Sequence, residues 1–333
     1  MVDPDARMGA LRLGRIRDWL LGGALLLALV VAVEFLVGWG PLLAPWRELS
    51  PWLLAWLFLL TALSYGLRAV RVSDYFGARL AGRFPAVLRL TILHNTANNL
   101  LPMRAGELVF PWLMRRYFGQ GLLDSAAALV WIRLLDLHFL ALIGLLILQL
   151  GHPSWLWWPA GGLWIAGLGV LILLSWMGES VRLAGAGRLR SILRRVLQAA
   201  PGDPRLIARV YGWTALIWSL KFVAFTSLLR FFLPIDVWRL LAGVMGAELS
   251  SVLPFHGIAG SGSYELAAVA ALAPLGVDPK PALAGAVNLH LFLLGSTLLL
   301  GALAFLLPGG AMPAGTRAAA LESQPATTMR DRS

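Results

Sequence analysis

The chain has 333 residues, of which 59% are hydrophobic and only 14% are charged, well below the roughly 25% charged residues of soluble domains. This small number of polar residues cannot cover the surface of a soluble domain. The composition therefore excludes most soluble enzyme folds and predicts a polytopic membrane protein. The net charge of +11 reflects basic residues in short connections, and we expect no nucleic-acid partner. With no Cys and no metal-ligand spacing among the five His, we expect no metal or cofactor.

The apolar pattern predicts an all-α helix bundle with one membrane domain over residues 19–307. A basic arm (1–18) precedes it, and a tail rich in Ala, Pro, Thr and Ser (308–333) is expected to be disordered. Runs of about 20 apolar residues are long enough to cross a bilayer. They predict seven full spans, at residues 19–38, 52–70, 125–150, 155–177, 211–232, 237–253 and 281–307.

Arginine residues cluster in alternate connections, which predicts the orientation of the spans. The N-terminal arm carries four Arg, residues 68–89 carry five and residues 178–209 carry seven. The connections at 39–51 and 151–154 hold only Arg47. Since cytoplasmic connections carry the excess of basic residues, we expect cytoplasmic N- and C-termini.

Two stretches break the apolar pattern, because they are too polar to face lipid and too apolar for ordinary loops. They are residues 93–110 (LHNTANNLLPMRAGELVF) and 248–266 (ELSSVLPFHGIAGSGSYEL). Each passes through small polar residues, Leu-Pro and Gly to a Glu that opens a new helix. Non-helical backbone survives at membrane depth only inside protein or beside a wet cavity. We therefore predict two re-entrant broken-helix segments, at about 91–118 and 250–276; the alternative is a pair of ordinary loops whose Glu residues cap helices.

The flanks of the two stretches match as well. Arg68 lies 34 residues before the first Leu-Pro proline, and Lys221 lies 33 before the second. After the Glu of each stretch, Arg133 follows at 26 residues and His290 at 25. Such parity indicates an internal repeat, and the opposite orientations of its spans predict that the repeat is inverted. Paired interrupted segments of this kind are typical of transporter sites, where exposed helix N-termini attract anions such as phosphate.

Arg133 and Asp136 lie three residues apart in the predicted span at 125–150 and can pair on one helix face. Each buried charge costs about 2.5–3.5 kcal/mol on insertion scales, so the presence of both indicates a role. The pair either locks the span against the first polar stretch or takes part in function, and the sequence leaves both readings open.

Three motifs in order resemble the lysylphosphatidylglycerol synthase transmembrane region, a family of flippase-like integral membrane proteins. They are NNLLPMRAGE (98–107), IRLLD (132–136) and LPFHGIAGSGSYE (253–265), and the likeness extends over about residues 15–307. The resemblance implies a protein of the bacterial inner membrane that moves a lipid between leaflets. The lipid would be an aminoacylated or other phospholipid, or a polyprenyl-linked sugar. The substrate-binding positions implied by the two breaks and the motifs are Asn98, Asn99, Pro102, Arg104, Gly106, Glu107, Arg133, Asp136, Pro254, Gly260, Gly262 and Glu265.

The sequence departs from the family pattern at three positions. Ile132 stands where an acid is usual, His290 where an Arg is frequent, and Ala259 where the family has the first of two glycines. The 333 residues also contain no counterpart of the family's C-terminal aminoacyl-transferring domain, so we expect no synthase activity.

The expected function is therefore lipid translocation, with membrane lipids as the partner molecules and no enzymatic activity. No nucleotide-binding motif occurs, so we expect no direct ATP hydrolysis. One alternative is an intramembrane lipid-modifying enzyme with Glu107 and Glu265 as acid and base. The other is a non-transporting partner of a lipid-synthesis complex. Two kinds of protein partner are compatible with the sequence: a second copy of this chain in a homo-oligomer, or a lipid-synthesis enzyme.

Overall fold

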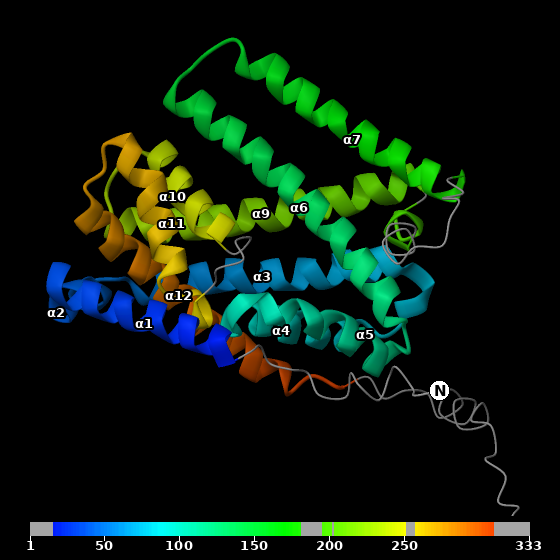
Figure 1. The fold of residues 1–333 in the computed structure, drawn as a ribbon, viewed down its shortest axis with the longest axis horizontal. Helices are drawn as coiled ribbons and strands as arrows, with labels where there is room; N and C mark the ends of the chain where they lie inside the picture. The colour runs from blue at the N-terminus through cyan, green and yellow to red at the C-terminus, as the bar shows by residue number, and fades with distance from the viewer. Residues whose placement is uncertain (1–15, 181–194, 202, 251–256, 310–333) are drawn as a thin grey trace, which may run out of the picture.

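The computed structural model describes residues 16–180, 195–201, 203–250 and 257–309 (Figure 1). Its α-helices are α1 (Ile16–Leu36), α2 (Trp39–Leu43), α3 (Pro51–Phe76), α4 (Phe84–Leu100), α5 (Val109–Phe118), α6 (Leu122–Gly151), α7 (Trp157–Ser180), α9 (Pro204–Phe232), α10 (Val237–Ser250), α11 (Ser263–Leu272) and α12 (Pro279–Ala304). Short 3-10 turns join them: η2 (Ala44–Arg47), η3 (Gly77–Leu80), η4 (Pro102–Leu108), η5 (Ile258–Gly260) and η6 (Ala273–Leu275). No strand occurs in these ranges. Nearly all of the predicted basic arm and disordered tail, and Pro254, lie outside them.

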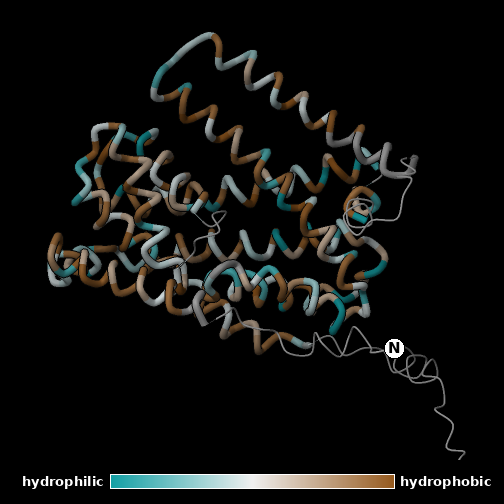
Figure 2. The backbone as a smooth tube through the Cα atoms, viewed as in Figure 1, coloured by the Kyte–Doolittle hydropathy of each residue, from teal (hydrophilic) through white to brown (hydrophobic). Residues whose placement is uncertain are grey.

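Five helical stretches are long and apolar enough to cross a membrane. They are Pro51–Leu80, Leu122–Gly151, Pro204–Phe232, Ile258–Leu275 and Pro279–Ala304, and a sixth arises if the bent pair Leu20–Leu36 and Trp39–Arg47 counts as one span. Figure 2 shows apolar residues along most of the length of these helices. The predicted all-helical membrane protein with several spans is therefore confirmed.

The predicted number of seven full spans is not reached in the described residues. α10, which begins the span predicted at 237–253, has 14 described residues, and it is not among the candidate spans of the described ranges. The last three residues of the span predicted at 237–253 lie outside the described set. Ile258–Leu275 is long and apolar enough to cross a membrane, although it lies in a segment that was predicted to be re-entrant. α7 corresponds to the span predicted at 155–177, but most of its side chains after Val170 are outside the described set.

The first predicted span, at 19–38, is instead the first arm of a sharp bend. The chain direction changes by 96° between α1 and α2. Gly38 lies at the corner with φ 85°, a conformation that glycine adopts without steric cost. Asn288 on α12 holds the bend, because its amide nitrogen donates to the Leu42 carbonyl at 3.1 Å and its amide oxygen accepts from the Trp46 indole at 2.6 Å.

Two long helices, α3 and α9, pack side by side and run antiparallel (Figure 1). Arg68 of α3 lies over the ring of Trp218, and Asp74, further along α3, accepts a hydrogen bond from Trp213, earlier in α9. Each long helix carries one short-helix hairpin: α3 packs on α4 and α9 packs on α10. α4 then contacts α12, while α10 contacts α6. The hairpins α4–α5 and α10–α11 therefore occupy corresponding places on opposite helices.

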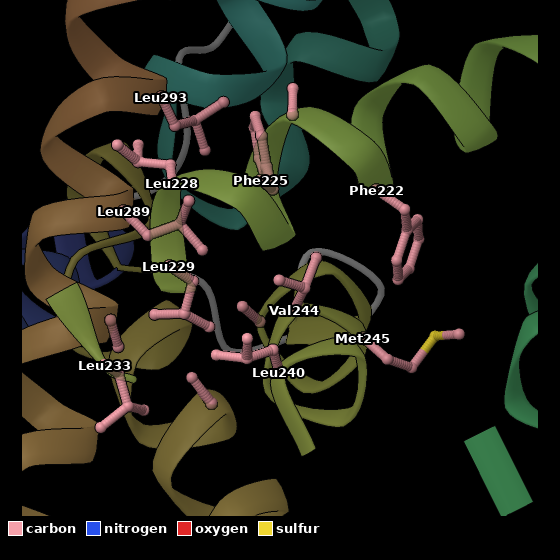
Figure 3. Close-up of a cluster of buried hydrophobic side chains, with 14 of the residues drawn as sticks. Phe222, Phe225, Leu228, Leu229, Leu233, Leu240, Val244, Met245, Leu289 and Leu293 are labelled. Carbon is pink, nitrogen blue, oxygen red and sulfur yellow. The ribbon is translucent and has the colours of Figure 1, made fainter. Parts of the chain in front are cut away.

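Apolar side chains fasten the second hairpin to the bundle. Figure 3 shows side chains of α9 and its C-cap, α10 and α12 meeting in one cluster: Phe222, Phe225, Leu228, Leu229, Leu233, Leu240, Val244, Met245, Leu289 and Leu293. A second cluster, which includes Val87, Leu90, Phe110 and Met114, joins α4 and α5 to their neighbours. In lipid, such close packing rather than the exclusion of water holds helices together. These clusters fix the hairpins on which the polar residues lie.

Candidate functional site

One polar cavity lies between the two hairpins and has a volume of about 130 Å³. Three amides of α4 line it (Asn95, Asn98 and Asn99), together with residues of η5, α10 and α11 (Ala259, Gly260, Glu248 and Tyr264). The long helices complete the wall with Arg68, Arg133, Asp136, Leu137, Leu140, Trp218, Lys221, His290 and Leu293. Charged and amide groups are costly inside a membrane protein, and their convergence on one cavity makes it the candidate site for a polar ligand.

The first polar stretch folds back on itself. Pro102 begins η4 directly after α4, where a residue without an N–H ends the helical hydrogen-bond ladder. Gly106 then passes so close to α4 that a Cβ on it would lie 2.3 Å from the amide nitrogen of Asn98. Its carbonyl contacts the imidazole Nδ1 of His94 at 3.2 Å. This close return brings Glu107 back to the face of α4.

The first and second motifs meet through a pair of opposite charges. The Arg133 guanidinium donates to Glu107 Oε1 at 2.8 Å and to Asp136 Oδ2 at 3.3 Å. Asn98 Nδ2 donates to the same Glu107 oxygen at 3.3 Å. Four of the positions predicted from the sequence thus form one connected network, although Glu107 itself is not part of the cavity wall.

Asp136 joins three helices and also lines the cavity. Its Oδ1 accepts from Arg71 of α3 at 2.6 Å and from the Trp218 indole of α9 at 2.9 Å. Arg71 also donates to Thr214 at 2.8 Å. The carboxylate is only 4% exposed, and removal of its partners would leave a buried charge uncompensated. Asp136 therefore has a structural role at the centre of the bundle.

The second polar stretch uses its glycines for backbone conformations that other residues disfavour. Gly260 and Gly262 have φ of 78° and 83°, and Ala259 has φ 53°. Glu265 Oε2 accepts from the Gly262 amide at 2.8 Å, which caps the first turn of α11. Its other oxygen, Oε1, lies 2.6 Å from Nδ1 of the buried His290. Glu265 thus caps a helix and holds a side chain of the cavity wall.

The two hairpins therefore contain matching acid–base pairs, Glu107 with Arg133 and Glu265 with His290. The similar spacings in the sequence correspond to these two contacts. Several predicted positions line the cavity: Asn98, Asn99, Arg133, Asp136 and Gly260. Others lie behind its wall: Pro102, Gly106, Glu107, Gly262 and Glu265. Arg104 is described only as backbone within η4, and Pro254 lies outside the described residues.

Sequence reasoning missed a second set of wall residues. Lys221 donates to Glu248 at 2.5 Å and lies over the Trp218 ring, 5.3 Å from its centroid. Tyr264 stacks on His290 with ring centroids 4.4 Å apart. Lys221 and Glu248 are charged residues within apolar runs, so their charge was a usable signal. Trp218 and Tyr264 gave none, because aromatic residues are common throughout the spans.

Comparison with known proteins identifies the family without identifying the ligand. The family model described as "Lysylphosphatidylglycerol synthase TM region" matches residues 19–301, most of the chain and both hairpins. Neither a curated protein nor a solved structure matches. Since the match includes both polar stretches and the helices that carry their partners, this multi-pass membrane protein belongs to the lysylphosphatidylglycerol synthase transmembrane region family.

Proposed function

We propose that the chain moves a lipid with a phosphate-containing headgroup between the leaflets of the bacterial inner membrane. The observation that carries this proposal is the polar cavity walled by both hairpins inside a largely apolar bundle. A headgroup in the cavity would exchange water for fixed amide and charged groups, while its acyl or prenyl tails stay in the surrounding lipid. The substrate is an anionic or aminoacylated phospholipid or a polyprenyl-phosphate-linked lipid.

The arrangement of the helices supports alternating access through an inverted repeat. α3 and α9 pack antiparallel, and each carries one broken hairpin with its own acid–base pair. In transporters built from inverted repeats, a site at the repeat interface opens to one side and then to the other as one half rocks against its counterpart. We assign the two hairpins, as re-entrant segments, to this role, with cytoplasmic N- and C-termini.

In this proposal the two glutamates are positioning residues. Glu107 holds Arg133 and Glu265 holds His290, so that each acid orients a basic side chain of the cavity wall. This geometry does not favour an enzyme that uses the two glutamates as acid and base, because that reaction needs both carboxylates at one reacting bond. Each carboxylate instead faces its own partner.

Transbilayer movement in reconstituted liposomes tests the proposal. The purified chain is inserted into vesicles that contain a panel of labelled lipids, and labelled lipid accessible from outside is followed over time. We expect faster exchange of phosphate-containing lipids than in protein-free vesicles. Glu107→Gln and Glu265→Gln should each abolish this acceleration at normal yield. Glu48→Gln removes an exposed carboxylate and should retain it.

Three outcomes would argue against the proposal. Wild-type vesicles that exchange every lipid in the panel at the protein-free rate would favour a non-transporting partner of a lipid-synthesis complex. Chemical conversion of a labelled lipid would favour the enzyme. Normal activity of both glutamine variants would contradict the positioning role proposed for the two glutamates.

A further inference from the structure

Arg68 is an unusual cation of the cavity wall, because it has no acidic partner among the described residues. Its side chain lines the cavity, and the residue is 8% exposed. No hydrogen bond or ion pair of its guanidinium occurs within those residues. Its guanidinium lies over the Trp218 ring, whose centroid is 5.6 Å from Cζ. Such a cation–π contact contributes less than a pair of opposite charges.

The other charged groups around the cavity are paired. Arg133 pairs with Glu107, Arg71 with Asp136, and Lys221 with Glu248. Asp136 attracts Arg68 electrostatically, but its oxygens already accept from Arg71, Arg133 and Trp218. Arg68 therefore adds a positive charge that this network of pairs does not neutralise.

The comparison with Lys221 shows that the missing partner is specific to one half of the molecule. The two basic residues hold corresponding positions on antiparallel helices, and both lie over Trp218. Lys221 has Glu248 at 2.5 Å. Within the described part of the chain Arg68 has no such partner, and Asn95, an amide of α4 in the same cavity wall, donates to the Thr91 carbonyl. A buried charge without a partner is costly, so its presence indicates that a ligand supplies the missing negative charge.

A second, independent feature indicates the same ligand. The Tyr264 hydroxyl is buried and has no hydrogen-bond partner, although its residue lines the cavity. Buried hydroxyls are normally hydrogen-bonded. A guanidinium provides several donors in a planar fork that matches a phosphate, and a hydroxyl adds one more. We propose that Arg68, assisted by the Tyr264 hydroxyl, binds a phosphate group in the cavity. The proposal rests on the proposed function only in assigning that phosphate to a lipid headgroup.

Equilibrium binding to the purified full-length chain in detergent tests this assignment. The probes are dihexanoyl phosphatidylglycerol, dihexanoylglycerol, which lacks the phosphate, and inorganic phosphate. We expect the wild type to bind the first probe and Arg68→Met to bind it at least about tenfold more weakly, the loss of one or more charge-assisted hydrogen bonds. Arg68→Lys should lie between them, because it keeps the charge and loses the fork. Arg116→Met, which removes an exposed cation of α5, should bind like wild type.

Thermal unfolding separates a ligand-binding arginine from a structural one. Without ligand, Arg68→Met should unfold at the same temperature as wild type or a higher one, because it removes an unpaired buried charge and keeps an apolar side chain. A structural arginine would show the reverse. Unchanged phosphatidylglycerol binding in Arg68→Met, absence of binding by wild type, or equal binding of dihexanoylglycerol would each overturn the proposal.

The remaining outcomes distinguish the source of the phosphate and the fate of the proposed function. Arg68-dependent binding of inorganic phosphate without binding of phosphatidylglycerol would overturn the lipid assignment. Arg68-dependent lipid binding by a chain that moves no lipid would support the phosphate site and contradict translocation. Lipid movement that is the same in Arg68→Met and wild type would support translocation and overturn the role of Arg68 in it.

Discussion

Replacement of Gly106 by Ala should disturb the first hairpin more than its small size suggests. A Cβ on residue 106 would lie 2.3 Å from the amide nitrogen of Asn98 and 2.5 Å from the carbonyl carbon of Ala97. Ordinary contacts begin at 3.4 Å, so η4 and α4 would have to separate by about 1 Å. The obstructing atoms are backbone, so a side-chain rotation cannot relieve the overlap. Overpacking of this kind costs about 1–3 kcal/mol.

The same separation should weaken the site. Asn98 and Arg133 reach Glu107 at 3.3 and 2.8 Å, and a shift of η4 would lengthen at least one of these hydrogen bonds. We therefore expect Gly106→Ala to lower both the unfolding temperature and the rate of lipid exchange in liposomes. Unfolding can be followed by intrinsic tryptophan fluorescence in detergent.

Gly144→Ala is the matched control. Gly144 lies inside α6, and a Cβ there would meet no atom within 4 Å. Alanine is favoured over glycine in a helix interior by about 0.5–1 kcal/mol, so this variant should unfold at the same or a higher temperature. If Gly106→Ala is as stable and as active as Gly144→Ala, the close packing of η4 on α4 is wrong, and the argument for the position of Glu107 is wrong with it.

Three further predictions concern a buried ion pair, an arginine of η4 and the topology. Arg71→Met should destabilise the protein by about 3 kcal/mol, because it leaves the buried Asp136 with fewer partners, and Arg71→Met combined with Asp136→Leu should recover most of the loss in a thermal unfolding assay; equal stability of the two variants would contradict this. Arg104→Lys should slow lipid exchange while leaving the unfolding temperature near that of wild type, since lysine lacks the bidentate fork; unchanged exchange would exclude the role proposed for that position. A Cys introduced between residues 188 and 209 of this Cys-free chain should resist impermeant thiol reagents in intact cells, whereas ready labelling from the periplasm would reverse the orientation.

The sequence predicted those features of the fold that follow from local composition. Long apolar runs located most of the long helices, Leu-Pro located the first interruption, and glycines marked the second. The matching intervals from Glu107 to Arg133 and from Glu265 to His290 predicted which residues correspond in the two halves. These predictions succeed because a bilayer imposes a length on each apolar run and excludes unpaired backbone.

Other features depend on contacts between distant parts of the chain and left no local pattern. The pairing of Arg71 with Asp136 joins residues 65 positions apart, and nothing near either residue indicates the other. Gly38 and Pro41 are a local signal for the 96° bend after α1. The prediction of a full span instead followed the length of the apolar run.

The unequal chemistry at corresponding positions has a consequence for thermodynamics. Two identical halves facing opposite ways would give inward-open and outward-open states of equal free energy, and lipid would then move only down its concentration gradient. In this chain Arg133 corresponds to His290, and the unpaired Arg68 corresponds to a Lys221 held by Glu248. In the proposed transporter each such difference would favour one end state, and about 1.4 kcal/mol is enough for a tenfold change in their ratio. The intrinsic preference between the two sides of the membrane would then reside in a few side chains around the cavity, so exchanging residues between corresponding positions would shift the resting state toward the opposite face.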